Sequence, residues 1–222
     1  AVVPNDVTFT FHSSRAPMKN VSAPELAAMN SHMERCSREL SDARMDIIAS
    51  ACLVAIMSQG AGYHRKTQAE LEAVCHVEAP DTQVITSAGA LVDSLKAIGA
   101  KRVSFITPYM KGLTELVAGY IENEGIKVKD TISLEIPNNL DVGAQDPKNL
   151  IEIVKRLDTS NVDAVVLSAC VQMPSLSALA EVQKSFDVPV LSTAAATVFQ
   201  ILKALNLPTV VPDAGELLSG KY

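Results

Sequence analysis

Two stretches of the chain, "DIIASACLVAIMSQG" (Asp46–Gly60) and "DAVVLSACVQMP" (Asp163–Pro174), present their residues in the same order. Each begins with an aspartate, continues as a short apolar run and then reads Ser-Ala-Cys. A short, nearly continuous apolar run is typical of a strand buried on both faces, as in a parallel sheet. The two cysteines, Cys52 and Cys170, therefore each follow the end of a predicted strand in a repeated unit.

Outward from these stretches, apolar runs alternate with segments of helical periodicity. The predicted strands are Val7–Ser13, Asp46–Ala51, Thr82–Ser87, Lys101–Tyr109, Lys127–Pro137, Asp163–Ala169 and Val188–Thr193. The predicted helices are Ala23–Leu40, Thr67–His76, Gly89–Gly99, Leu113–Gly125, Asp146–Leu157, Ser175–Phe186 and Ala195–Asn206. This alternation indicates βαβ units and predicts an α/β fold. We expect two pseudo-symmetric lobes, each a parallel sheet flanked by helices, with the functional site in the cleft between them.

The order of elements also predicts how the lobes divide. The second half carries an opening strand and helix that the first half lacks, so we expect a strand–helix unit to be missing from the first lobe. We assign residues 1–98 to the first lobe, joined by the C-terminal segment 194–222. Residues 99–193 form the predicted second lobe.

Composition excludes several classes of partner. The 222 residues are 48% hydrophobic and 20% charged, with a net charge of −6 and no run rich in Lys or Arg, so nucleic acid is a poor candidate. No apolar stretch reaches the roughly 20 residues that span a bilayer, and no signal-like segment opens the chain. The four cysteines show no metal-ligand spacing, so we expect reduced thiols, no metal and a cytoplasmic protein.

Cys52 and Cys170 lie where a parallel sheet binds its ligands, beyond the carboxyl ends of the strands. Backbone N–H groups that follow such strand ends can face an anion and can lower the pKa of a thiol. A cysteine after a strand is often only a small buried hydrophobe, but two cysteines at equivalent places in a repeat favour a function. Cys36 and Cys75 lie within predicted helices, where packing is the better interpretation.

The segments around both cysteines, "SACLVAIM" and "SACVQMPSL", resemble the maleate cis–trans isomerases of the aspartate/glutamate racemase superfamily. "FTFHSSR" (Phe9–Arg15), "GYHR" (Gly62–Arg65) and "TPY" (Thr107–Tyr109) are also similar to that branch. The resemblance implies a cofactor-independent isomerisation of maleate to fumarate through a covalent succinyl-cysteine intermediate. It implies that Cys52 is the nucleophile and that Cys170 donates and recovers a proton.

The same resemblance implies a substrate-binding set. Tyr109 matches a hydroxyl donor and Asn139 an amide that contacts the substrate, and backbone N–H groups match two carboxylate cradles around Leu53, Val54, Val171 and Gln172. A small dicarboxylate substrate, a homodimer and a place in the degradation of nicotinate-type aromatics are also implied. The family's Pro-Ser-Ser-Asn segment after its first strand has no match in this sequence.

Three alternatives stay open at this point. The chain could be an amino-acid racemase or an arylmalonate decarboxylase of the same superfamily, although the threonines that adjoin both cysteines of the racemases are absent. It could also be a non-catalytic protein that binds small anions, with both cysteines as packing residues. The roles of the two cysteines could be exchanged. His12 and His64 are interpreted as exposed or hydrogen-bonded histidines, and Arg15 as a structural or interface residue as readily as an anion ligand.

Overall fold

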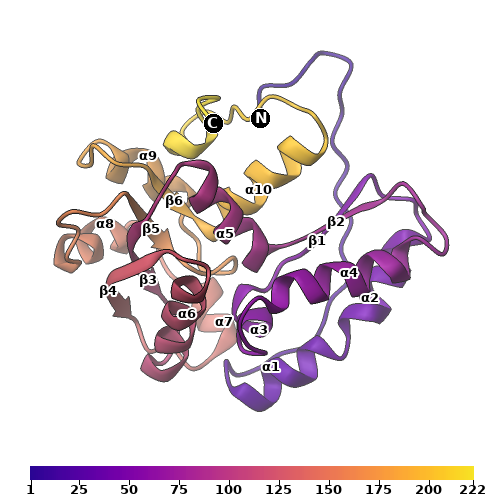
Figure 1. Ribbon diagram of the computed structural model, residues 1–222, viewed down its shortest axis with the longest axis horizontal. Coiled ribbons are helices and arrows are strands. Elements are labelled where there is room, and N and C mark those ends of the chain that lie inside the picture. Colours follow the sequence, from indigo (N-terminus) through magenta and orange to yellow (C-terminus); the bar gives the residue numbers. More distant parts are fainter.

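Two parallel sheets organise the protein, whose residues 1–222 are all described by a computed structural model (Figure 1). The first sheet pairs β1 (Ile47–Ser50) with β2 (Gln83–Thr86). The second sheet has the order β4-β3-β5-β6, and every pair in it is parallel. Its strands are β3 (Arg102–Thr107), β4 (Lys127–Ser133), β5 (Ala164–Ser168) and β6 (Val190–Ser192). The predicted α/β class with parallel sheets is confirmed.

Burial follows the position of each strand in its sheet. All five residues of β5 are buried, because β3 and β6 flank it and helices cover the sheet. This accounts for its nearly unbroken apolar sequence, which ends at the buried Ser168. The edge strand β4 has only two apolar residues, Val128 and Ile132, and has no fully buried position.

Helices connect and cover the strands (Figure 1). They are α1 (Ala23–Asn30), α2 (Met33–Ser41), α3 (Leu53–Met57), α4 (Tyr63–Cys75), α5 (Ser87–Ala97), α6 (Lys111–Asn123), α7 (Asn139–Gly143), α8 (Asn149–Ile153), α9 (Leu176–Gln183) and α10 (Thr193–Ala204), with short 3₁₀ turns at Val154–Arg156 and Glu216–Leu218. None of these helices combines the length and the apolar character that a membrane crossing needs.

The predicted strand Val7–Ser13 is wrong. These residues have no ladder partner and form part of an extended segment, with Phe11 90% exposed. In the repeat, Val7–Ser13 corresponds to β4, which is the edge strand of the second sheet and pairs with β3. The first sheet contains only β1 and β2, so it has no strand equivalent to β3 with which Val7–Ser13 could pair. An alternating sequence needs a neighbouring strand before it can form a ladder, because its backbone hydrogen bonds lie between strands. We call residues 7–21 the strap.

The single predicted helix Ala23–Leu40 is also wrong, because the structure divides it into α1 and α2. The break falls at Ser31 and His32, which follow Asn30. The Ser31 hydroxyl donates to the Ala28 carbonyl at 2.7 Å, and the Asn30 amide donates to Ala55 O of α3 at 2.8 Å. Short polar side chains that bond to backbone groups in this way compete with helix continuation.

The division into lobes stays our proposal. β1 and β2 belong to the residues that we assign to the first lobe, and β3 to β6 belong to the second. The C-terminal helix α10 packs on α5 and β2, beside the first sheet, as a returning segment would.

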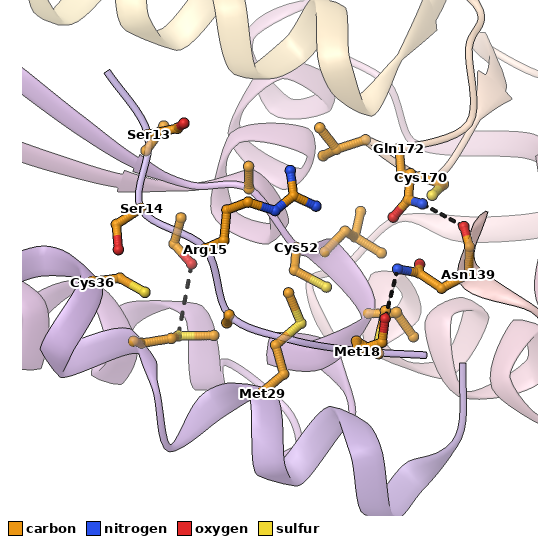
Figure 2. A pocket seen from close by; sticks show the side chains of 18 of the residues that line it. Ser13, Ser14, Arg15, Met18, Met29, Cys36, Cys52, Asn139, Cys170 and Gln172 are labelled. Atoms are coloured by element: carbon orange, nitrogen blue, oxygen red, sulfur yellow. Dashed lines mark hydrogen bonds between the residues drawn. The ribbon is translucent and has the colours of Figure 1, made fainter. Parts of the chain in front are cut away.

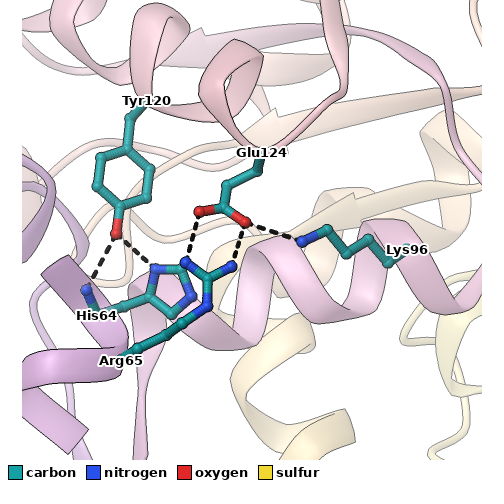
Figure 3. Close-up of polar contacts among 5 residues, drawn as sticks. All are labelled: His64, Arg65, Lys96, Tyr120 and Glu124. Atoms are coloured by element: carbon teal, nitrogen blue, oxygen red, sulfur yellow. Dashed lines mark hydrogen bonds and ion pairs between the residues drawn. The ribbon is translucent and has the colours of Figure 1, made fainter. Parts of the chain in front are cut away.

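A polar cluster joins the helices of the two proposed lobes (Figure 3). The backbone N–H of His64 on α4 donates to the Tyr120 hydroxyl on α6 at 3.0 Å, and that hydroxyl also bonds to Nδ1 of His64. Burial lowers the pKa of His64, which keeps the ring neutral in this role.

Glu124, just after α6, forms the charged part of this cluster. Its carboxylate accepts two hydrogen bonds from Arg65, one of them at 2.8 Å, and another from Lys96 at 2.8 Å. Its side chain is only 6% exposed. The Arg65 hydrogen bonds, ahead of those from Lys96, lower the pKa of Glu124 from 4.5 to about 2.

Replacing Glu124 with glutamine is expected to lower the free energy of unfolding at pH 7 by about 1–2 kcal/mol, a figure reduced by solvent screening because both cations are about half exposed. A carboxyl whose folded pKa lies below its unfolded value stabilises the fold above about pH 4.5. It loses that effect as the pH falls toward 2. The difference between wild type and Glu124→Gln should therefore shrink over this range in urea titrations.

The matched control is Glu152→Gln, which removes an ion pair with Lys155 whose side chains are 72% and 62% exposed. Such a surface pair is expected to contribute less than about 0.5 kcal/mol. Equal stability of Glu124→Gln and wild type at pH 7 would show that the cluster does not hold the lobes together.

Candidate active site

Cys52 lies at the junction between β1 and α3. The strand ends at Ser50, and Cys52 is the N-cap residue of the helix, with an extended backbone (φ −137°, ψ 100°). All five residues of α3 are buried, so the apolar sequence Leu53–Met57 anchors this turn in the core. Backbone N–H groups of Ala55 and Val54 face the sulfur and favour its thiolate form.

Cys170 occupies the corresponding place after β5. It lies two residues beyond the end of that strand and is 6% exposed, whereas Cys52 is partly exposed. Backbone N–H groups of Met173 and Gln172 face its sulfur, and the Tyr109 side chain also lowers the pKa of the thiol. The two Ser-Ala-Cys units thus present their thiols in the same way, each to N–H groups two or three residues further along the chain.

The two sulfurs face one shared cavity (Figure 2). Its volume is about 400 Å³, and its walls include both cysteines and all the residues predicted for substrate binding, namely Leu53, Val54, Tyr109, Asn139, Val171 and Gln172. The thiols are close enough for the charge of one to disturb the ionisation of the other, because a Cys170 thiolate raises the pKa of Cys52. The cavity is therefore a single site to which both proposed lobes contribute.

Ionisation of these thiols is unfavourable in the ligand-free protein. Burial, with a smaller effect from Cys170, raises the pKa of Cys52 to about 11 despite the N–H groups of Ala55 and Val54. Burial also raises the pKa of Cys170, an effect that Tyr109 partly offsets. Both cysteines are thus thiols at neutral pH. This form suits a proton donor, but a nucleophilic cysteine must lose its proton before it attacks.

The pKa of the Tyr109 hydroxyl depends on both cysteines. It follows β3 and is 3% exposed. Burial raises the pKa of its hydroxyl well above the ordinary value, and the charges of Cys170 and Cys52 raise it further. The hydroxyl therefore stays protonated and can donate a hydrogen bond to a neighbouring anion.

Asn139 reaches the cavity from α7, a short helix that the sequence did not predict. Asn138 is the N-cap, and its side-chain oxygen accepts from Leu140 N at 2.8 Å. The Asn139 amide donates to the carbonyl of Met18 on the strap at 3.2 Å, and Gln172 donates to the backbone carbonyl of Asn139. Figure 2 shows these bonds at one side of the cavity.

The structure also brings to the cavity residues that were not selected from the sequence. Arg15 and His12 of the strap line it, together with Met18, Met29 and Val142. The remaining histidine that was weighed, His64, is 3% exposed and bound to Tyr120 in the interlobe cluster. All four cysteines are free, and no three His, Cys, Asp or Glu side chains gather into a group that could hold a metal ion.

Comparison with known proteins agrees with the fold. A family model described as arylmalonate decarboxylase matches residues 7–218. A maleate isomerase from Geobacillus stearothermophilus is 59% identical over 215 residues, which cover 97% of this chain and 86% of the relative. The chain belongs to the maleate isomerases of the arylmalonate decarboxylase family.

Solved structures of the maleate isomerase family show the same architecture. A Pseudomonas putida maleate isomerase crystallised with maleate superposes with a TM-score of 0.95 at 54% identity, covering 97% of this chain and 86% of the other. A variant of the Nocardia farcinica maleate cis–trans isomerase with a covalently bound succinylcysteine intermediate has a TM-score of 0.94 at 41% identity. That match covers 99% of this chain and 89% of the other.

Proposed function

We propose that this protein isomerises maleate to fumarate without a cofactor, through a covalent succinyl-cysteine intermediate. The observation that carries the proposal is the shared cavity, in which two thiols from equivalent strand ends flank a space suited to a small molecule. The maleate isomerases similar to this chain, and the succinylcysteine intermediate in one of them, support the same chemistry.

In this proposal Cys52 is the nucleophile, and its thiol first loses its proton to solvent to form the attacking thiolate. Its thiolate adds to one alkene carbon of maleate, and the electron pair of the double bond moves to the neighbouring carbon, where Cys170 delivers its proton. The former double bond is then a single bond and can rotate. Cys170 as thiolate recovers the proton, the double bond re-forms in the trans geometry, and the Cys52 thiolate leaves. The cycle consumes no proton and transfers no electrons between molecules.

The polar groups around the cysteines hold the carboxylates in this proposal. Tyr109 and Asn139 donate from side chains, and the N–H groups around Leu53 and Val54 and around Val171 and Gln172 donate from the backbone. Fixed dipoles of this kind stabilise the charge that develops when the thiolate adds, because they need no rearrangement during the step.

Exposure supports Cys52 rather than Cys170 as the attacking thiol. Cys52 is partly exposed at the helix start, whereas Cys170 is buried against Tyr109, which can supply a hydrogen bond while the proton moves. We further propose, from the family resemblance, a cytoplasmic homodimer that acts in the degradation of nicotinate-type aromatics.

The function is tested by incubating the protein with maleate in buffer that contains EDTA and following the reaction by proton NMR. Fumarate should accumulate without added cofactor. Parallel samples with L-aspartate, L-glutamate and phenylmalonate should show neither racemisation nor release of carbon dioxide. A racemised amino acid or a decarboxylated malonate, with maleate unchanged, would replace the isomerase proposal by one of the superfamily's other activities.

A further inference from the structure

The cavity contains one residue with a permanent charge. Arg15 is the only Lys or Arg among the residues that line it, and no Asp or Glu lines it at all. This distribution is notable in a chain that carries a net charge of −6. A cavity with one cation and no carboxylate is electrostatically suited to an anion.

The Arg15 guanidinium has no partner within the protein. No carboxylate oxygen lies within 4.0 Å of it, whereas other arginines of this lobe, such as Arg35, Arg38 and Arg65, form ion pairs. Figure 2 shows the guanidinium extending from the strap toward the space between Cys52 and Gln172. Its five N–H donors are therefore available to a bound molecule.

Contacts on both sides hold the strap around Arg15. Toward α2, Arg35 donates to the Arg15 carbonyl at 2.8 Å and to Glu39 at 2.6 Å, and Glu39 also accepts from the Ser14 hydroxyl.

Toward the second lobe, Asn139 donates to the carbonyls of Met18 and Lys19, and Val21 N donates to the Pro137 carbonyl at 3.0 Å. The backbone that carries Arg15 is thus fixed at two points, which reduces the entropy lost when its side chain binds.

We propose that Arg15 binds one carboxylate of the substrate as an ion pair and thereby selects dicarboxylates over their half-esters. This inference rests on the proposed function, because it names the group that recognises the second charge of maleate. The charge of Arg15 adds to the neutral donors, namely the N–H groups, Tyr109 and Asn139, that hold the carboxylates in the proposed function. Arginine suits the role because its planar fork matches the two oxygens of a carboxylate.

The charge of Arg15 also offsets an unfavourable effect of the substrate on the ionisation of Cys52. A dianionic substrate would further raise the pKa of Cys52, which burial already raises to about 11. A cation beside the substrate offsets part of that repulsion.

Binding is tested first, with succinate, a saturated dicarboxylate that cannot isomerise. Isothermal calorimetry compares wild type with Arg15→Gln, Arg15→Lys and the control Arg156→Gln, which alters an exposed arginine outside the cavity. We expect the Kd to rise about 10- to 100-fold in Arg15→Gln, less in Arg15→Lys and not at all in Arg156→Gln. A Kd for Arg15→Gln within twofold of wild type, or no succinate binding by wild type, would overturn the proposal.

Kinetics then test selectivity with maleate and its monomethyl ester. In Arg15→Gln, KM for maleate should rise about 10- to 100-fold with a smaller change in kcat, and kcat/KM for the half-ester should change less than threefold. Equal losses for both substrates would overturn the selective role. If wild type binds succinate through Arg15 but leaves maleate unchanged, the isomerase proposal fails while the role of Arg15 in diacid binding stands.

Discussion

The Cys52→Ser variant is expected to lose maleate isomerisation almost completely, with kcat reduced by about 10⁴-fold or more. A serine hydroxyl ionises far less readily than a thiol, and an alkoxide leaves the adduct poorly, so both the addition and the elimination are slowed. The loss is measured as the rate of fumarate formation in the NMR assay. The substitution changes one atom in a partly exposed position, so the thermal midpoint should stay close to that of wild type.

The matched control for this variant is Cys36→Ser. Cys36 lies on α2 at the edge of the cavity, and its sulfur contacts Arg35 at 3.4 Å. If a cavity thiol were needed only for packing, the two variants would behave alike. We expect Cys36→Ser to keep kcat within about twofold of wild type, since surface substitutions away from a reacting centre have small effects. Substantial turnover by Cys52→Ser would remove Cys52 from the chemistry.

The Cys170→Ser variant is expected to trap the intermediate. Cys52 can still add to maleate, and the neighbouring carbon can acquire a proton slowly from serine or solvent. Removal of that proton then lacks its base, so kcat should fall about 10²- to 10⁴-fold and the adduct should accumulate. Intact-protein mass spectrometry should show a gain equal to one maleic acid, and peptide mapping should locate it on Cys52.

The same experiment decides between the two possible assignments of the cysteines. An adduct on Cys170 in the Cys52→Ser variant, with none on Cys52 in Cys170→Ser, would show that the roles are exchanged. No adduct in either variant, with both still binding succinate, would favour a protein that binds small anions without reacting with them. Each result is read from the modified peptide and not from activity alone.

Most strands and helices were predictable because their causes are local. β5 and β1 are short apolar runs bounded by polar residues, and α5, α6 and α10 keep helical periodicity over more than ten residues. The errors arose where local pattern and tertiary context disagree. Val7–Ser13 alternates like a strand but has no neighbour to pair with, and Ala23–Leu40 is periodic but breaks where Asn30 bonds to α3.

The site was predictable in part, for a similar reason. The two Ser-Ala-Cys units are recognisable in the sequence as a repeat. Tyr109 and Asn139 were predicted from the resemblance to a family. Arg15 carried no signal that separated it from a structural arginine. Arg15 matters because no Asp or Glu lines the cavity around it. That feature depends on the tertiary structure and cannot be read from the sequence.

The sequence by itself determined the class of fold, the strand ends at which Cys52 and Cys170 lie and the N–H groups that follow them, because hydrophobic runs and turns act over a few residues. Only the tertiary structure decided that the two thiols share one cavity, that Asn139 and the strap meet beside it, and that a single unpaired cation faces it. Those relations join residues more than a hundred positions apart, and they are set by how the two sheets and their helices pack.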